Sequence, residues 1–335
     1  MEPVLHRAAA LRAAGYNEDD VRRLLRAGVL VPVRRGAYVE RERAPDDAVA
    51  RHSLLLQAAL AELGTGAVAS HVSAAVMHGL PTWGLALDRA HVTFDRPSGG
   101  RLEARLHVHT APLHADDVVM VHGLVVTSVA RTVVDVARRA RFEAAVTVAD
   151  AALRSVLGDV PARRTEYGTT ATSDSPDSTA GLRDAGRAAA VPQALPAVLD
   201  AAVRRAKGWP GVPAARQVIA FADGRSESVG ESRSRVAIAR AGLPSPVPQF
   251  PVRLARGVAY SDFGWPQHRT VGEFDGKVKY GRLLRPGQDP GDAVFEEKLR
   301  EDAIRARGWE VVRWTWTDLP DFTDTAVRIR DRFRG

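Results

Sequence analysis

Residues 158–195 divide the chain into two parts that can each fold around a core of their own. This stretch (GDVPARRTEYGTTATSDSPDSTAGLRDAGRAAAVPQAL) is rich in Thr, Ser, Asp, Gly, Pro and Ala and carries few large apolar side chains. A segment of this composition buries too little apolar surface to offset the entropy lost on folding, so we expect a linker or a disordered insertion. The parts on either side of it in this 335-residue chain are each long enough to bury a core.

The order of predicted helices and strands indicates an α/β multidomain protein. We expect a winged helix-turn-helix over residues 1–45, a mixed α/β domain over 46–157, the linker over 158–195, and a domain of order αβββαβ within 196–335. No run approaches the roughly 18 apolar residues of a membrane span, and the N-terminus lacks the apolar core of a secretory signal. We therefore expect a cytoplasmic protein with no membrane partner.

The absence of cysteine restricts the chemistry that the chain can carry. Disulfides, zinc-thiolate sites and thiol nucleophiles are excluded. Any metal must bind oxygen or imidazole ligands, which favours magnesium or manganese. The net charge of +7 and the pI near 10.2 indicate a polyanionic partner such as nucleic acid, although the excess of Arg over Lys is also typical of a GC-rich genome.

Two short helices and a hairpin are predicted at the N-terminus. The pattern predicts helices over 4–14 and 18–27, the second beginning after the N-cap Asn17 and ending at Gly28. The sequence VLVPVRRGAYV then reads as a small hairpin. Helix, turn, helix and wing together predict a winged helix-turn-helix.

Five arginines of this region are candidate DNA contacts. Arg22, Arg23 and Arg26 lie on the predicted recognition helix, and Arg34 and Arg35 lie on the wing near phosphates. The alternative is an amphipathic helical hairpin whose arginines face solvent.

The region from residue 46 to 157 alternates between helices and strands. The expected elements are helices at 48–63, 69–78, 128–139 and 142–156, and strands near 90–95, 105–110 and 117–126; after the linker, helices at 196–207 and 212–221 lead into the last domain. Thr127 or Ser128 is expected to cap the helix at 128–139.

Histidines crowd the same region: His71, His78, His91, His107, His109, His114 and His122. His107 and His109 alternate on one predicted strand, but no carboxylate or third histidine stands at a recognisable ligand spacing. We therefore expect scattered structural histidines rather than a metal site.

The last hundred residues carry paired acids on a predicted hairpin. The expected order is a helix at 231–241, strands at 247–254, 258–265 and 270–275, a helix at 292–307 and a strand at 309–316.

The register of this hairpin predicts an electrostatic conflict. If Trp265 and Thr270 close a four-residue loop, Asp262 lies directly opposite Glu273, and Asp275 shares their sheet face. Like charges opposed at roughly 4.5–5.5 Å destabilise a sheet, and a divalent cation held by the carboxylates is the simplest compensation. The alternative is that the acids face solvent and form salt bridges.

Residues 227–320 resemble the PD-(D/E)XK nuclease superfamily, and within it the very-short-patch-repair-like endonucleases. The residues that carry the resemblance are Asp262, Glu273-Phe274-Asp275-Gly276 and Gly308-Trp309-Glu310-Val311-Val312-Arg313, in the order αβββαβ. The resemblance implies a restriction-endonuclease-like fold in which Asp262 and Glu273 bind Mg²⁺ or Mn²⁺, with the Phe274 carbonyl as a third ligand and Glu231 as an auxiliary acid.

One position departs from the superfamily pattern. Its lysine would stand two residues after Glu273, where this chain has Asp275. Lys277, Lys279 or Lys298 is expected to supply the missing ammonium group. The loop that follows the hairpin bears Arg282 and Arg285, which with Lys279 would contact DNA as a flap; a plain connection is the alternative.

The N-terminal part resembles a second family. GYNEDDVRRLLRAGVLVPVRRGAYV followed by SHVSAAVMHGL is similar to the winged-helix and following domain of abortive-infection type IV antitoxins, over roughly residues 1–150. The resemblance implies DNA binding as a transcriptional repressor and allows a toxin protein as a second partner.

The two resemblances predict a DNA-binding protein with a Mg²⁺-dependent, endonuclease-like C-terminal domain that hydrolyses phosphodiesters. The competing hypothesis is a transcriptional regulator or antitoxin whose nuclease fold is catalytically inactive.

Neutralising Arg22, Arg23 and Arg26 together is expected to weaken DNA binding and to flatten its salt dependence. Each lost phosphate contact reduces the slope of log K against log salt concentration by about 0.9. Binding titrations of wild type and the triple Gln variant at several salt concentrations measure the slope. Equal slopes for the two proteins would contradict the predicted recognition helix.

Overall fold

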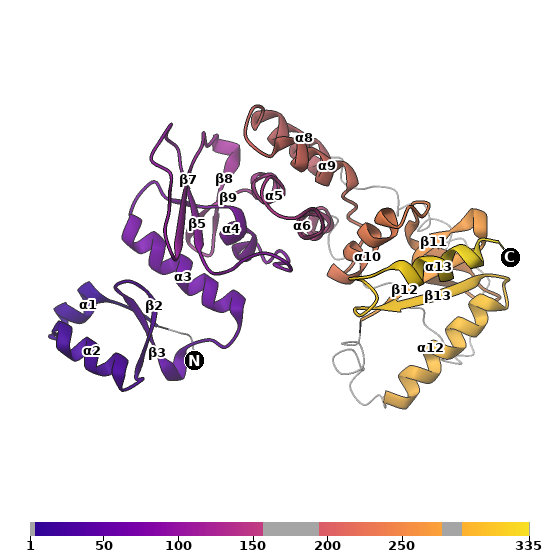
Figure 1. Cartoon of the computed structure of the whole chain (residues 1–335), viewed down its shortest axis with the longest axis horizontal. Coiled ribbons are helices and arrows are strands. Elements are labelled where there is room, and N and C mark those ends of the chain that lie inside the picture. Colours follow the sequence, from indigo (N-terminus) through magenta and orange to yellow (C-terminus); the bar gives the residue numbers. More distant parts are fainter. Residues whose placement is uncertain (1–3, 157–193, 277–289, 335) are drawn as a thin grey trace, which may run out of the picture. The chain divides into compact units, whose positions relative to one another are not determined.

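The computed structural model describes residues 4–156, 194–276 and 290–334, and these residues form two compact units (Figure 1). One unit contains residues 4–148 and 197–221, and the other contains the remaining described residues. The predicted linker falls outside the described residues, except that residues 194 and 195 begin a helix. None of the described helices is both long and apolar enough to cross a membrane.

The N-terminal elements follow the predicted order, with one added strand. They are β1 (Leu5–Arg7), α1 (Ala8–Ala13), α2 (Glu18–Arg26), β2 (Leu30–Arg34), β3 (Ala37–Glu40) and the 3-10 helix η1 (Arg41–Arg43). Helix α1 starts later than predicted because residues 5–7 pair with β3, which gives a sheet of order β1-β3-β2.

The ends of α2 confirm the predicted capping residues. The Asn17 side chain accepts a hydrogen bond from Asp20 N at 2.9 Å, and the Asp20 carboxylate accepts one from Asn17 N at 3.0 Å. Gly28 follows the helix with φ 70°, a conformation that costs glycine little. The hairpin also forms as predicted, since Arg34 pairs with Ala37 around a two-residue turn.

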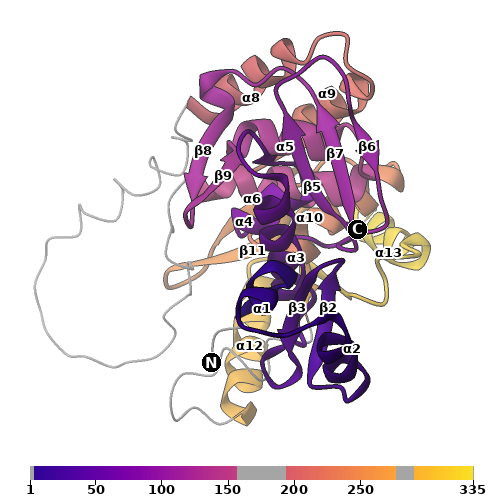
Figure 2. The same ribbon diagram turned by 90° about the vertical axis from the view of Figure 1, so that its left-hand side faces the viewer.

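A six-stranded mixed sheet, visible in Figure 2, forms the middle of the first unit. Its elements are α3 (Ala48–Leu63), β4 (Val68–Ala69), α4 (His71–Met77), β5 (Ala90–Phe94), β6 (Arg101–Leu102), β7 (Leu106–Thr110), η2 (Ala115–Asp117), β8 (Val118–Val121), β9 (Leu124–Thr127), α5 (Val129–Ala137) and α6 (Phe142–Val156). The strand order is β6-β7-β5-β4-β9-β8. The region predicted as one strand at 117–126 is a hairpin, because Val121 pairs with Leu124.

The core of this unit lies between α3 and the sheet. Leu55, Leu56 and Ala59 of α3 pack with Val92 of β5 and Val108 of β7, all of them buried. Ser128 caps α5 by accepting a hydrogen bond from Arg131 N at 3.4 Å, which confirms one of the two predicted caps. Residues 4–148 lie in one compact unit.

Helices α8 (Ala194–Arg205) and α9 (Val212–Phe221) pack on the first unit, whereas the sequence placed them at the start of the last domain. Arg205 of α8 forms an ion pair with the buried Asp117 at 2.8 Å. The Trp209 ring lies against the Arg131 and Arg138 guanidinium groups, at 4.6 and 4.9 Å. A local sequence pattern does not predict such contacts, because the residues are distant in sequence.

The second unit contains a four-stranded sheet with helices on both faces. Its elements are α10 (Val229–Arg240), β10 (Val247–Arg253), β11 (Val258–Trp265), η4 (Pro266–His268), β12 (Thr270–Asp275), α12 (Pro290–Arg305), β13 (Glu310–Thr315) and α13 (Thr323–Arg332). The strand order is β10-β11-β12-β13, antiparallel except for the parallel pair β12 and β13. The predicted order αβββαβ is confirmed, and α13 extends it.

Two apolar clusters show which helices cover each face of this sheet. Trp265 and Trp314 pack with Ile238 of α10 and Ile329 of α13 on one face. A second cluster contains Ile304 of α12 and covers the other face. The sheet is therefore the middle layer of three, as the predicted order requires.

Replacing Gly272 by Ala is expected to destabilise the second unit. A Cβ at this position would lie 2.5 Å from the Trp314 ring and 3.1 Å from the Trp265 ring, both of them buried. Overpacking of this kind costs about 1–3 kcal/mol in free energy of unfolding. Urea unfolding followed by tryptophan fluorescence measures it, because four of the six tryptophans lie in this unit.

Gly276→Ala is the matched control for this change. Its Cβ would meet nothing closer than 3.6 Å. If both variants unfold at the same urea concentration, the tight packing around Gly272 does not limit stability.

Candidate functional site

Glu231 is fixed in the first turn of α10 by four hydrogen bonds around its cap. Ser228 caps the helix by accepting from Glu231 N at 3.1 Å, and its hydroxyl donates to Glu231 Oε1 at 2.8 Å. Glu227 N donates to Oε2 at 2.8 Å, and Gln249 Nε2 of β10 donates to the same oxygen at 3.0 Å. The carboxylate is thus buried at the edge where α10 meets β10.

Asp262 lies beside this group on β11. Its Oδ2 accepts a hydrogen bond from Phe274 N of β12 at 2.7 Å. The Asp262 charge raises the pKa of Glu231, so the two carboxylates are close enough to interact. Two acids predicted as metal ligands are therefore neighbours in space.

The predicted direct opposition of Asp262 and Glu273 is not formed. The hairpin register is as predicted from Trp265↔Thr270 to Phe263↔Gly272, but the pairing ends there. The ladder between β10 and β11 also leaves Asp262 and the opposite residue, Gln249, out of its register. Gln249 has φ 51°.

This local irregularity redirects the side chains. Ser261 reaches Glu273, with Oγ donating to Oε1 at 3.2 Å, and Asp262 accepts a hydrogen bond from Phe274 N. The predicted common face of Asp262 and Glu273 assumed a strict two-residue alternation, which the interrupted pairing breaks.

Two arginines hold Glu273. Arg300 of α12 donates to Glu273 Oε1 at 2.5 Å, and Arg313 of β13 lies 3.1 Å from Oε2. Both arginines also bind Glu297, at 2.8 and 2.5 Å. Asp275 pairs with Arg313 at 3.3 Å. The acids and arginines form one charge network on this part of the sheet.

Burial and mutual repulsion set the proton affinities of these acids. Burial, and then the Asp262 charge, raises the pKa of Glu231 to about 8. Burial also raises the pKa of Glu273, although Arg300 and Arg313 oppose this shift. Burial alone would raise the pKa of Glu297, but the hydrogen bonds from the two arginines lower it to about 2.

The expected ammonium groups are not found at this site within the part of the chain that the structure describes. Lys298 of α12 is exposed, and the residue of that helix that reaches Glu273 is Arg300. The other predicted cations Lys277, Lys279, Arg282 and Arg285 lie outside the described residues.

The acidic residues are spread more widely than a compact metal cage. Among the described residues, the only group of three or more His, Asp or Glu whose ligand atoms all lie within 4.8 Å of one another is His71, His91 and His109. Glu231, Asp262 and Glu273 do not meet this spacing.

The histidine group corrects a sequence interpretation. We expected scattered structural histidines, but β5 and β7 pair in parallel and bring His91 beside His107 and Thr93 beside His109. His71 approaches the same place from the start of α4. Strand pairing, which the sequence does not reveal, creates this cluster.

The N-terminal arginines differ in their surroundings. Arg22, Arg23 and Arg26 are exposed on α2, although Arg22 and Arg23 pair with acids one turn earlier. Arg35 is exposed in the hairpin turn. Arg34 is buried and pairs with Glu62 of α3 at 3.2 Å, a position that does not fit the predicted phosphate contact.

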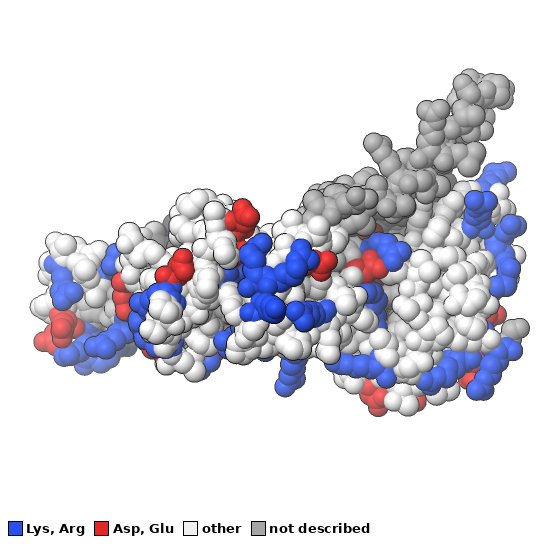
Figure 3. Space-filling model, turned by 90° about the horizontal axis from the view of Figure 1, so that it is seen from above, with Lys and Arg blue, Asp and Glu red and all other residues white. Residues whose placement is uncertain are grey.

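Charge is mixed over the surface. On the face drawn in Figure 3, basic side chains gather in several groups and acidic side chains lie among them. The basic side chains therefore do not form one uninterrupted patch on this face.

Sequence reasoning missed Gln249, Arg300 and Arg313. The sequence signal for Arg313 is its place at the end of the Gly-Trp-x-Val-x-Arg strand. In the structure, the parallel register pairs Arg313 with Glu273. Arg300 lies two residues after Lys298, one of the lysines that were expected to supply an ammonium group to the acidic site. Nothing in the sequence marks Gln249.

No protein-family model matches the chain. The chain is similar to two uncharacterized proteins from two strains of Mycobacterium tuberculosis, each 28% identical over 193 residues. The match covers 57% of this chain and 55% of each relative, so the chain spans about half the length of the curated relatives that it matches. Their names state no activity.

Replacing Glu231 by Gln is expected to stabilise the protein more at alkaline than at acidic pH. The folded-state pKa of about 8 lies above the ordinary 4.5, so the stability that this group contributes is full below pH 4.5 and is lost as pH rises toward 8. The variant has no such loss. The difference in free energy of unfolding between the variant and the wild type, called the gap below, should therefore grow by a few kcal/mol as the pH rises. Each unit by which the pKa is raised is worth about 1.4 kcal/mol.

Urea unfolding of both proteins at pH 5.5 and pH 8.5, without divalent cations, measures the gap. Titrating groups far from Glu231 act equally in the two proteins and cancel, so the change in the gap reports Glu231 together with its interaction with Asp262. A gap that is the same at both pH values would mean that Glu231 ionises normally.

Proposed function

We propose that the second unit hydrolyses phosphodiester bonds of DNA with the help of Mg²⁺ or Mn²⁺, and that the N-terminal helices bind the DNA. The observation that carries this proposal is the pair of neighbouring acids, Glu231 of α10 and Asp262 of β11, in a unit of element order αβββαβ. Such a pair gains from a divalent cation because the cation removes their mutual repulsion.

The donor atoms at this site suit a hard cation. Carboxylate oxygens of Glu231 and Asp262 would hold the ion, and the Phe274 carbonyl is the proposed third ligand. Gln249 orients Glu231, and Phe274 N orients Asp262. The bound ion would activate a water molecule and neutralise charge that develops on the phosphoryl oxygens.

Arg300 and Arg313 are the proposed replacements for the superfamily lysine. Their guanidinium groups already bind a carboxylate, Glu273, and the same donors match the oxygens of a phosphate. In this proposal DNA phosphate competes with Glu273 for the arginines, which frees the third acid to turn toward the ion. Lys298 then has no catalytic part.

A second candidate function has an observation in its favour. Both oxygens of Glu273 are engaged by arginines, and Asp275 stands where a lysine would be, itself paired with Arg313. These features suit a transcriptional regulator or type IV antitoxin, in the cytoplasm, whose nuclease fold clamps DNA or a toxin without cutting.

Incubation with supercoiled plasmid and Mg²⁺ separates the two functions. The wild type is expected to nick the plasmid, and Asp262→Ala and Glu273→Ala are each expected to reduce the nicking rate by at least about 10–100-fold, because the ion loses a ligand or its support. Gel electrophoresis over time measures the rate, with EDTA as the metal-free arm.

Asp302→Asn on the exposed side of α12 is the matched control, since it also removes one carboxylate from the same unit. It should nick like the wild type. Wild-type protein that shifts the plasmid on a gel but leaves it intact would overturn the enzyme and support the regulator.

A further inference from the structure

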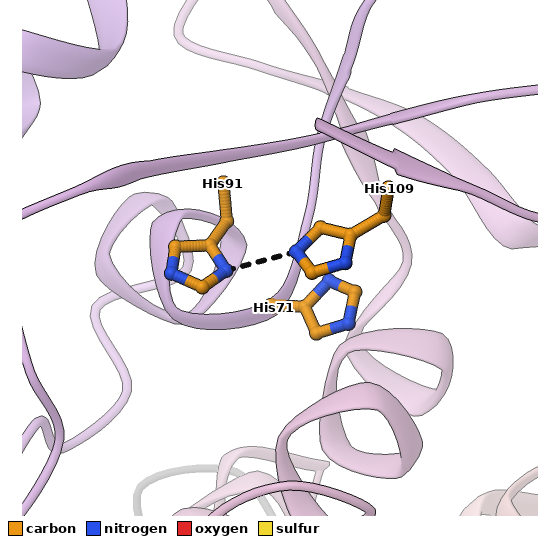
Figure 4. A group of neighbouring side chains, drawn as sticks. All are labelled: His71, His91 and His109. Atoms are coloured by element: carbon orange, nitrogen blue, oxygen red, sulfur yellow. Dashed lines mark hydrogen bonds between the residues drawn. The ribbon is translucent and has the colours of Figure 1, made fainter. Parts of the chain in front are cut away.

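The histidine cluster of the first unit has the geometry of an incomplete coordination shell (Figure 4). His91 Nδ1 lies 3.0 Å from His109 Nε2. The His71 ring stacks on the His109 ring, with the centroids 3.8 Å apart. In a tetrahedral zinc site with Zn–N bonds of about 2.0–2.1 Å, neighbouring ligand nitrogens lie about 3.3 Å apart. The ligand atoms of the three histidines all lie within 4.8 Å of one another.

His71 shows that the cluster is not explained by packing alone. Its Nε2 is buried and has no hydrogen-bond partner, whereas its Nδ1 is 3.0 Å from Ser70 Oγ. Its backbone has φ 53°, a left-handed conformation that is uncommon for residues other than glycine. A buried polar atom without a partner and an unfavourable backbone conformation are both costly, and both are typical of ligand-binding positions.

The surroundings orient the rings as outer partners of a metal site do. Thr93 Oγ1 donates to Ser70 Oγ at 2.8 Å, which fixes the hydroxyl that binds His71 Nδ1. With the Nδ1 proton donated to Ser70, the Nε2 lone pair of His71 is free for a cation. His91 and His109 now share one proton between Nδ1 and Nε2, and moving it to an outer ring nitrogen frees both lone pairs.

We propose that His71, His91 and His109 bind one divalent transition-metal ion of the Zn²⁺ class, with the fourth position open to water or to His107. Three imidazoles without thiolate or carboxylate favour Zn²⁺, Co²⁺, Ni²⁺ or Cu²⁺ over Mg²⁺. His107 is a neighbouring imidazole, with its ring centroid 3.8 Å from that of His109, although it is outside the group whose ligand atoms all lie within 4.8 Å of one another.

The charges around the cluster act in both directions. Burial lowers the pKa of His91 to about 3 and that of His109 to about 2, so protons do not compete for the lone pairs at neutral pH. Arg138 and Arg139 place positive charge nearby and oppose a cation. Asp135 pairs with Arg138 at 3.2 Å, and Asp88 acts on His91 with the opposite sign.

The experiment uses untagged, full-length protein stripped with a chelator, so that no polyhistidine tag contributes ligands. Calorimetric titration with Zn²⁺ is expected to show one site per chain, and Co²⁺ should give the visible absorption bands of a tetrahedral nitrogen-rich site. Bound Zn²⁺ should raise the midpoint of thermal unfolding by several degrees, because it binds only the folded state. Mg²⁺ should do none of these things.

Variants test the assignment. His91→Gln alone and the triple variant His71→Asn, His91→Gln, His109→Gln should lose at least tenfold in Zn²⁺ affinity and should lose the Co²⁺ bands. Circular dichroism checks that each is folded, and Asn at position 71 tolerates the positive φ. His122→Asn is the matched control, since His122 is exposed and also has a positive φ, 48°.

Each outcome bears on the site. Retained Zn²⁺ affinity in the folded triple variant, or equal loss in His122→Asn, would mean adventitious surface binding and would overturn the proposal. Loss of the Co²⁺ bands in His107→Ala would make His107 the fourth ligand, whereas unchanged bands would leave water there. Because nicking requires Mg²⁺ and the acids of the other unit, neither result depends on the proposed nuclease activity.

Discussion

The buried guanidinium group of Arg131 holds the first unit together. It binds Asp117 at 3.0 Å, Asp135 at 2.9 Å and the Pro112 carbonyl at 3.0 Å, and the Trp209 ring covers it. Neither the arginine nor the two acids would be tolerated in a core alone, because an unpaired buried charge costs several kcal/mol. The network therefore requires α5, the end of η2 and the segment between α8 and α9 to assemble together.

Local patterns predicted what local forces determine. Asn17 caps α2, and Trp265 pairs with Thr270, because capping and short hairpin loops depend on neighbours in sequence. The pattern could not foresee that Asp262 falls where strand pairing is interrupted. Nor could it foresee that parallel pairing of two distant strands gathers His91 and His109, since register between such strands is set by the whole sheet.

The acidic site of the second unit combines two electrostatic solutions. Glu273 is neutralised by two arginines, which suits a stable, closed arrangement. Glu231 is close to the Asp262 charge, and burial together with that charge raises the pKa of Glu231 to about 8. One half of the site thus resembles an internal salt bridge, and the other half resembles a site prepared for a cation. In the proposed functions, the balance between these two arrangements decides whether the unit cuts DNA or only binds it.

The chain passes between its two units three times, after residues 148, 196 and 221. Residues 149–156 complete the second unit from the N-terminal side, and 197–221 complete the first unit from the C-terminal side. A backbone cut between residues 157 and 193 would therefore give two fragments that each carry a piece of both units. For the same reason, a single joint in the gene could not transfer either unit without part of the other.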